Sequence, residues 1–190
     1  MKRTLTAIAL AAPMTLAAQG PSYTHVEGGL NWVDPPGRYG SSDLGILIRG
    51  SYALDDTVFL RGGLSSHRFD YRSGPPGDRR TRTWDRDILS AGVGFRVPME
   101  NNIDAYGAVD VLHDFGDADD TGFRLEGGVR TVFAPSWDSA AGLRYARLSS
   151  HDNVQLFGST FYEVAPQFSI GGEVAVGDYD ELLLGARYRF

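Results

Sequence analysis

The last nine residues, "LLLGARYRF" at 182–190, separate into two faces when they are read as a β-strand. Neighbouring side chains of a strand point to opposite faces, so every second residue shares a face. One face carries Arg187 and Arg189. The other face is apolar throughout and consists of Leu182, Leu184, Ala186, Tyr188 and Phe190. At a free sheet edge this strand would expose an apolar terminal edge, so the stretch favours a sheet that closes on itself.

The first twenty residues have a different composition from the rest of the chain. Lys2 and Arg3 give a positive start, an apolar run follows from Leu5 to Leu16, and Ala18-Gln19-Gly20 is a small-x-small site. This layout is typical of a secretory signal peptide. The alternative is a membrane anchor, but the run is short for a hydrocarbon layer of about 30 Å. The expected cut falls after Ala17, Ala18 or Gly20.

Removal of a signal peptide at residues 1–20 would leave a single barrel domain at residues 21–190. It would also change the formal net charge from −6 to −8, because Lys2 and Arg3 are lost. Such an acidic chain is unsuited to general nucleic-acid binding, which needs a basic field. The sequence has no cysteine, which excludes disulfides and cysteine metal sites. No later stretch is long and apolar enough for a transmembrane helix.

After residue 20, the dominant hydrophobic period is two, which is the period of a strand. Ten runs of alternating residues follow, and each has about the 9–11 residues that a tilted strand needs to cross a bilayer. Bacterial single-chain barrels have an even number of strands, and ten runs agree with this. The sequence therefore predicts an all-β, antiparallel up-and-down transmembrane β-barrel of ten strands, with eight strands as the alternative. The ten predicted strands are 22–33, 43–54, 57–68, 84–97, 103–113, 122–133, 138–149, 153–164, 168–176 and 181–190.

The connections between these runs alternate in length. One set is tight, and the other includes the polar stretches "DPPGRYGSS" at 34–42, "DYRSGPPGDRRTRT" at 70–83 and "DFGDADDTG" at 114–122. Tight turns on the periplasmic side and longer loops on the extracellular side are typical of outer-membrane barrels. Both termini are then expected on the periplasmic side.

Charged residues recur at mid-strand on the face opposite the apolar residues. Unpaired charge is costly in a dry sheet interior, whereas a small barrel lumen accommodates charges that pair across strands. Nine arginines and five acids therefore predict a polar, side-chain-filled lumen with a positive excess. This lumen charge network comprises Glu27, Arg49, Arg61, Arg86, Arg96, Asp104, Asp110, Arg124, Glu126, Arg130, Arg144, Glu173, Arg187 and Arg189.

Two stretches resemble the small outer-membrane β-barrel proteins of Gram-negative bacteria, in the OmpA/OmpX-like superfamily and its uncharacterised ten-stranded proteobacterial group. "YTHVEGGLNWVD" at 23–34 is similar to the opening of such barrels. The C-terminal strand resembles their assembly signal, with Leu182, Leu184, Tyr188 and Phe190 in the matching positions. The resemblance implies the cell outer membrane as the location. It also implies periplasmic chaperones and the barrel-assembly machinery as partners during biogenesis.

The omptin proteases are ten-stranded barrels whose rim site resembles an Asp pair facing an Asp/His pair. Here Asp85, Asp87, His113 and Asp114 are near strand tops, with His151 and Asp152 in a loop. The omptin motifs are not reproduced in context, and Asp85 and Asp87 share a face with the lipid-side set. The adjacent Ser150 and His151 face opposite ways if they are in a strand, which argues against a dyad. The histidines also lack metal-ligand spacing. We predict no enzyme, no cofactor and no metal site.

The stretch 67–86 holds the basic cluster of an otherwise acidic chain. Arginine forks suit phosphate, and the outer leaflet is rich in lipopolysaccharide phosphate. Arg72, Arg79, Arg80 and Arg82 are therefore candidates for lipopolysaccharide contact. The simpler interpretation is a solvated loop, since charged surface runs usually just face solvent.

These observations predict a monomeric, non-catalytic outer-membrane barrel with a structural or surface-interaction role, in contact with outer-membrane lipid and lipopolysaccharide. The alternative is a narrow channel for small solutes or anions. An extracellular-rim hydrolase of the omptin type is a remote third possibility.

Overall fold

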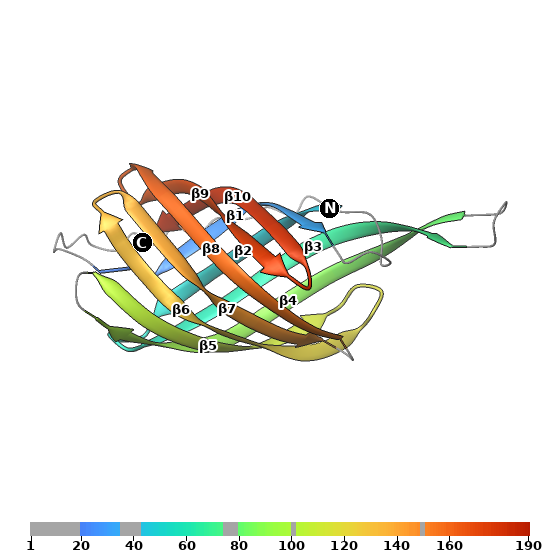
Figure 1. Ribbon diagram of the computed structural model, residues 1–190, viewed down its shortest axis with the longest axis horizontal. Helices are drawn as coiled ribbons and strands as arrows, with labels where there is room; N and C mark the ends of the chain where they lie inside the picture. The colour runs from blue at the N-terminus through green and yellow to red at the C-terminus, as the bar shows by residue number, and fades with distance from the viewer. Residues whose placement is uncertain (1–19, 35–42, 74–79, 100–101, 149–150) are drawn as a thin grey trace, which may run out of the picture.

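Ten antiparallel strands make up the computed structural model, which describes residues 20–34, 43–73, 80–99, 102–148 and 151–190 (Figure 1). The prediction of ten strands is confirmed, and the alternative of eight is wrong. The predicted signal peptide lies outside the described residues, apart from Gly20. The strands are β1 (His25–Asp34), β2 (Asp43–Ala53), β3 (Val58–Ser73), β4 (Arg80–Pro98), β5 (Ile103–Asp114), β6 (Asp120–Ala134), β7 (Trp137–Leu148), β8 (His151–Ala165), β9 (Phe168–Gly177) and β10 (Asp180–Arg189).

Each strand pairs with its neighbours in the sequence, and the last strand pairs with the first. The order is β1-β10-β9-β8-β7-β6-β5-β4-β3-β2, which closes the barrel. In the closing pair, Leu30 lies opposite Leu184 and Glu27 lies opposite Arg187. The C-terminal strand is therefore paired on both sides, with β1 and with β9. Closure removes the exposed edge that a terminal strand would otherwise present.

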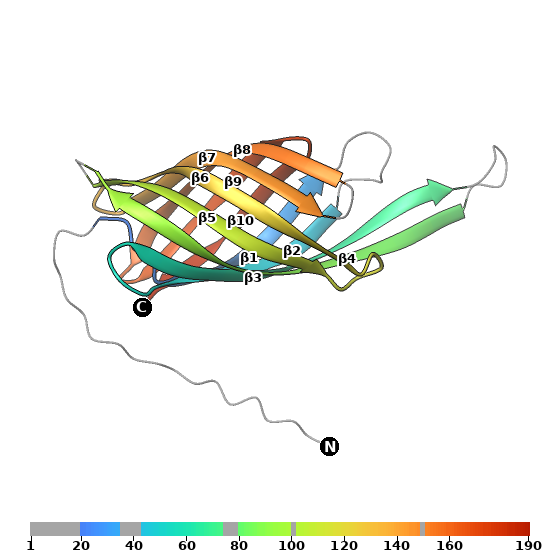
Figure 2. The same ribbon diagram turned by 90° about the horizontal axis from the view of Figure 1, so that it is seen from below.

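The two ends of the barrel differ in their connections. The turns after β2, β4, β6 and β8 lie at the same end as residues 20–24 and the C-terminus, and we call this the turn end (Figure 2). The opposite end, which we call the loop end, carries the described connections after β5 and β9. In the β2–β3 turn, Asp55 accepts hydrogen bonds of 2.7 Å from the amides of Thr57 and Val58. These two bonds hold the pKa of Asp55 below its usual range.

The outer surface of the barrel carries a belt of exposed apolar side chains. Leu30 is 55% exposed, Leu143 is 61% exposed and Leu184 is 61% exposed. At the turn end the belt finishes in exposed aromatic rings on successive strands, among them Phe133, Trp137 and Tyr162. Trp137 lies 5.9 Å from Phe133 and 5.0 Å from Tyr162, measured between ring centroids. An apolar band bordered by aromatic rings is the surface that outer-membrane barrels present to lipid.

The candidate assembly-signal side chains lie on this belt. Leu182 and Leu184 are exposed near the middle of β10, and Tyr188 and Phe190 are exposed at its turn end. The rings of Tyr188 and Phe190 stack with centroids 6.3 Å apart. In the described part of the chain, no helix has the length and apolar character needed to cross a bilayer.

The hairpin of β3 and β4 is longer than predicted and projects beyond the rest of the barrel (Figures 1 and 2). The sequence predicted a polar loop over 70–83, but the ladder continues outward to the pair Ser73 and Arg80. Cross-strand polar pairs join the two strands there. Arg68 donates to Asp85 at 2.8 Å, and Thr83 donates to Asp70 at 3.1 Å. The prediction was wrong because it required apolar alternation, whereas these strands pair outside the apolar belt.

Candidate functional site

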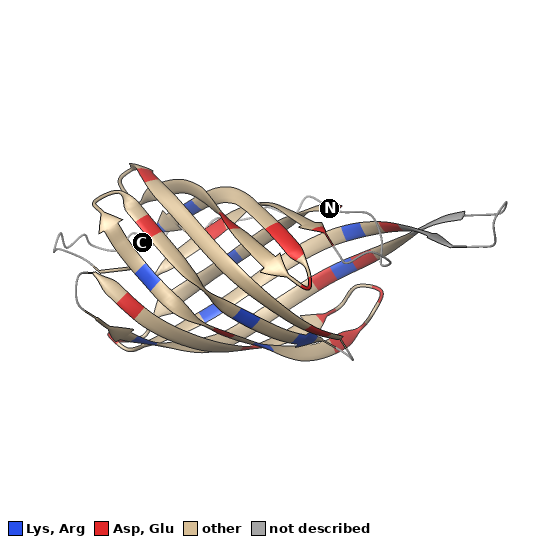
Figure 3. Cartoon of the chain, in the orientation of Figure 1, with Lys and Arg blue, Asp and Glu red and all other residues tan. Residues whose placement is uncertain are grey.

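The fourteen charged residues that the sequence assigned to the lumen all have side chains that are no more than 28% exposed. They lie at the inward parity of their strands, and both signs occur on the strands around the barrel (Figure 3). Glycines on the same faces make room for long side chains. Gly29 of β1 lies opposite Gly185 of β10, where an added Cβ would overlap the neighbouring backbone.

Arginines and acids alternate through the lumen in a continuous series. At its loop-end start, the Nε of Arg124 donates to Asp110 at 2.7 Å. Asp110 also accepts two hydrogen bonds of 2.7 Å from Arg61. Arg61 donates to Glu126 at 3.0 and 3.2 Å, and Glu126 accepts a further bond of 2.9 Å from Arg144. Each of these two carboxylates therefore bridges two arginines from different strands.

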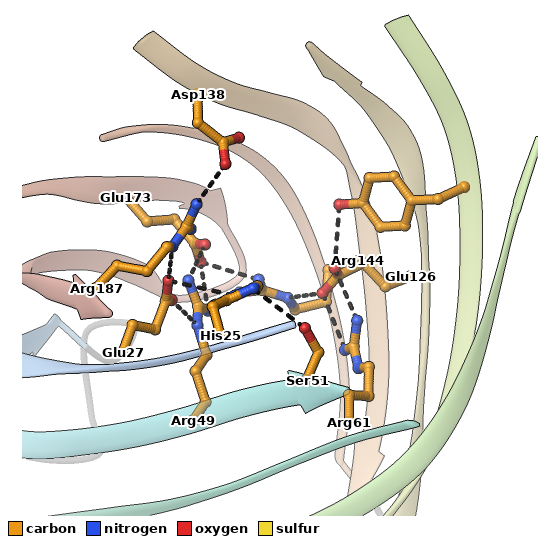
Figure 4. A network of polar contacts seen from close by, with 11 residues as sticks. His25, Glu27, Arg49, Ser51, Arg61, Glu126, Asp138, Arg144, Glu173 and Arg187 are labelled. Atoms are coloured by element: carbon orange, nitrogen blue, oxygen red, sulfur yellow. Dashed lines mark hydrogen bonds and ion pairs between the residues drawn. The ribbon is translucent and has the colours of Figure 1, made fainter. Parts of the chain in front are cut away.

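The series continues across the barrel to strands from the N-terminal and C-terminal parts of the chain. Arg144 donates to Glu173 at 2.9 Å, and Arg49 donates to Glu173 at 2.6 Å. Arg49 also bonds Glu27, which accepts at 2.7 Å from Arg187. These bonds join β7, β9, β2, β1 and β10. Figure 4 shows how these side chains converge on one region of the lumen.

Asp138 and Arg130 complete the series. Arg187 donates to Asp138 at 3.0 Å, and Arg130 holds the same carboxylate through two bonds of 2.9 and 2.6 Å. We call the whole series the ion chain. It contains six arginines and five acids drawn from eight of the ten strands, and its members in order are Arg124, Asp110, Arg61, Glu126, Arg144, Glu173, Arg49, Glu27, Arg187, Asp138 and Arg130.

Further acids face the lumen or its mouths and are not in the predicted network, among them Asp114, Asp138, Glu163 and Glu181. Asp114 lies 3.7 Å from Arg86, and Glu163 pairs with Arg189. Glu181 accepts a hydrogen bond of 2.9 Å from Gln155. Their parity was the available signal, since Asp138 shares its face of β7 with Arg144. With these acids included, the predicted positive excess of nine arginines over five acids disappears among the described residues of the lumen.

Tyr23 occupies the lumen at the turn end. Its side chain is buried, and its ring centroid lies 4.6 Å from that of Phe59 and 6.4 Å from that of Tyr106. The guanidinium groups of Arg96 and Arg130 lie 5.0 and 4.9 Å from the ring centroid, within the range of cation–π attraction. Burial raises the pKa of the Tyr23 hydroxyl well above its ordinary value, so the ring enters the lumen uncharged.

Hydrogen bonds to residues 21–24 anchor this ring, and we call this segment the turn-end cap. The hydroxyl of Ser51 donates to the carbonyl of Tyr23 at 2.6 Å, and the amide of Ala53 donates to the hydroxyl of Thr24 at 3.1 Å. Arg96 donates to the carbonyl of Pro21 at 3.3 Å. The cap therefore bonds to β2 and β4 and covers the turn-end mouth of the lumen.

Two cavities lie along the barrel axis. The inner cavity, of about 110 Å³, is next to the turn-end cap and is lined by Tyr23, Glu27 and Arg61 among others. The outer cavity, of about 150 Å³, opens toward the loop end. Arg49, Arg124 and Arg144 line both cavities. This layer of three arginines, held by the acids of the ion chain, separates the two cavities.

The rim residues that resemble the omptin pairs make separate contacts. Asp85 pairs with the exposed Arg68, while Asp152 of β8 pairs with Arg147 at 3.6 Å. β8 lies four strands away from β4 around the barrel. His113 contacts the hydroxyl of Thr121 at 3.2 Å on the outer face. Of the lipopolysaccharide candidates, Arg79 lies outside the described residues, and the structure describes only the backbone of Arg72, Arg80 and Arg82.

The closed barrel agrees with the comparison of this chain with known proteins. The family described as "Outer membrane protein beta-barrel domain" matches residues 4–190. The chain belongs to this family. It is an outer-membrane protein, and its turn end is the periplasmic end by the usual arrangement of such barrels. Comparison with curated protein sequences gave no match.

Solved structures of outer-membrane proteins share this fold at low sequence identity. The KdgM porin in complex with disordered oligogalacturonate is 10% identical, with a TM-score of 0.54 over 87% of this chain and 99% of that chain. OprG from Pseudomonas aeruginosa is 13% identical, with a TM-score of 0.50 over 87% of this chain and 94% of that chain. The NanC porin is 8% identical, with a TM-score of 0.50 over 88% and 100%. At these identities the likeness establishes the fold.

Proposed function

We propose that the protein is a closed outer-membrane barrel with a structural or surface-interaction role, without catalysis and without an open pore. The observation that carries this proposal is the ion chain. Its eleven side chains cross the lumen and join eight strands, so a solute would have to break several buried ion pairs in order to pass. Breaking a buried pair leaves an uncompensated charge, which is strongly unfavourable. The turn-end cap adds a second barrier on the turn-end side of the ion chain.

The surface-interaction part of the proposal rests on the β3–β4 hairpin. It extends beyond the other strands at the loop end, which faces the cell exterior in this family's usual orientation (Figure 2). Its described side chains include polar cross-strand pairs, such as the ion pair of Arg68 with Asp85. A paired two-stranded ribbon on a rigid barrel is suited to present its tip at a distance from the lipid surface.

Planar-bilayer recording of the purified barrel tests the closed lumen. We expect no steady single-channel conductance from the wild-type protein in neutral salt. Steady conductance would favour the second candidate function, a narrow channel for small solutes or anions. That candidate is supported by the cavities on either side of the arginine layer and by the fold shared with porins.

Lipopolysaccharide is the proposed surface partner of the hairpin. Replacing Arg79, Arg80 and Arg82 together by glutamine removes three guanidinium groups suited to phosphate. We expect the triple variant to retain less than about half of the lipopolysaccharide that co-purifies with the wild type, since hydrogen bonds to charged groups are among the stronger ones. The amount is measured by phosphate analysis of the purified barrels. An unchanged amount of lipopolysaccharide in the triple variant would count against the contact.

A further inference from the structure

Within the ion chain, the charge of Arg124 is the least compensated. The chain has one arginine more than it has acids, and its two ends are Arg124 and Arg130. Arg130 is held by both oxygens of Asp138. Arg124 instead makes a single bond to an oxygen of Asp110 that also accepts from Arg61. Among the described residues, none accepts a hydrogen bond from the two terminal nitrogens of Arg124. The excess positive charge therefore lies in the arginine layer, which forms the base of the outer cavity and also lines the inner cavity.

The walls of the outer cavity add to this excess. Its described lining contains four arginines, Arg49, Arg86, Arg124 and Arg144, and a single acid, Glu181. The Nε of Arg86 is buried and has no hydrogen-bond partner in the described part of the chain, because its nearest acid oxygen, on Asp114, is 3.7 Å away. Buried donors without partners are rare in folded proteins, and a water or an ion is one of the groups that can satisfy such a donor.

The same cavity has an apolar side. Val33, Phe69 and Leu112 are each less than 8% exposed and line the cavity on the loop-end side of the arginine layer. A volume of about 150 Å³ has room for about five water molecules at about 30 Å³ each, or for a small organic molecule. The cavity thus combines an arginine floor with an apolar wall.

We propose that the outer cavity is a binding site for a short-chain carboxylate that enters from the extracellular side. The carboxylate accepts hydrogen bonds from the free nitrogens of Arg124 at the floor, where guanidinium geometry matches it in bidentate fashion. Its short tail packs toward Phe69 and Leu112. This site is independent of the proposed closed lumen, because the ligand binds above the arginine layer and does not cross it.

Isothermal titration calorimetry on the refolded full barrel tests the site, with butanoate as the probe. Butanamide is the uncharged control of equal size, and inorganic phosphate is the competing anion. We expect saturable binding of butanoate, no measurable binding of butanamide, and weaker binding of phosphate, which has no tail for the apolar wall. Equal heats from butanoate and butanamide would overturn the proposal, and tighter binding of phosphate than of butanoate would overturn the carboxylate assignment.

Arg124→Gln is the decisive variant and Arg68→Gln is its matched control. Arg68 loses the same charge but lies outside the cavity, in an exposed pair with Asp85. The Arg124 variant is expected to bind butanoate about tenfold more weakly or worse, as for loss of a charge-assisted hydrogen bond, while the Arg68 variant keeps the wild-type affinity. Equal affinities in the two variants would refute the site. Heat-modifiable gel migration verifies that each variant folds. If Arg124→Gln does not fold, Arg86→Gln takes its place, with the same expected loss of affinity for butanoate.

Discussion

Replacing Glu126 with alanine is expected to destabilise the barrel by about 3–5 kcal/mol and to make it conduct ions. Glu126 is buried and accepts hydrogen bonds from Arg61, Arg144 and the hydroxyl of Tyr106. Loss of this carboxylate leaves the ion chain with six arginines and four acids. It also removes the bridge between Arg61 and Arg144, which lies beside the arginine layer. We therefore expect an anion-selective conductance from a barrel that is silent in its wild-type form. Urea unfolding and planar-bilayer recording measure the two effects.

Two further variants separate the causes of this effect. Glu126→Gln keeps the volume but loses the charge, so we expect reduced stability while the barrel stays silent. Asp85→Asn removes an acid from an exposed ion pair on the hairpin, and such pairs contribute little to stability. We expect the Asp85 variant to match the wild type in both measurements. A Glu126→Ala barrel with wild-type stability and no conductance would show that the ion chain is not the barrier.

Replacing Tyr23 with alanine is expected to cost about 3–5 kcal/mol of stability, as for other buried aromatic residues. The ring packs on Phe59 and lies under the guanidinium groups of Arg96 and Arg130. Its removal joins the inner cavity to the periplasmic mouth, while the arginine layer stays intact. We therefore expect lower stability in urea unfolding, without the conductance of the Glu126→Ala variant.

Tyr23→Phe is the matched control for the turn-end cap. The Tyr23 hydroxyl is buried, and no described residue accepts or donates a hydrogen bond at its oxygen. Phenylalanine keeps the ring and removes an unsatisfied polar group, so this variant is expected to be at least as stable as the wild type. A large loss of stability in Tyr23→Phe would show that the hydroxyl, and not the ring, anchors the cap. Equal stability of Tyr23→Ala and the wild type would show that the cap contributes nothing.

The strand count and the direction of each face could be predicted because alternation is a local property. In β10, Leu184 is exposed and Arg187 is buried, as the parity of "LLLGARYRF" indicates. The length of the β3–β4 hairpin could not be predicted in this way. Its outer part lies beyond the apolar belt, where neither face needs to be apolar, so the pattern that marks a membrane strand is absent there.

The members of the charged lumen followed largely from parity, but the acids near strand ends did not. Asp138 is the second residue of β7 and Glu181 is the second residue of β10, so both lie at strand ends, whereas the predicted network was drawn from charges nearer mid-strand. The turn-end cap was also missed. The predicted first strand includes Tyr23, whereas β1 begins at His25 and Tyr23 folds into the lumen.

A ten-stranded sheet with one lipid face and one charged face follows from the sequence alone, because each strand separately has apolar and polar residues in alternation. Only the tertiary structure decided which arginine bonds which acid. Arg187 meets Glu27 across 160 residues, and Arg49 meets Glu173 across 124 residues. Such partners come together only when closure of the barrel and the stagger of its strands bring inward side chains to the same height. That same closure left Arg124 with a single shared acid, which is a property of the closed barrel and not of any one strand.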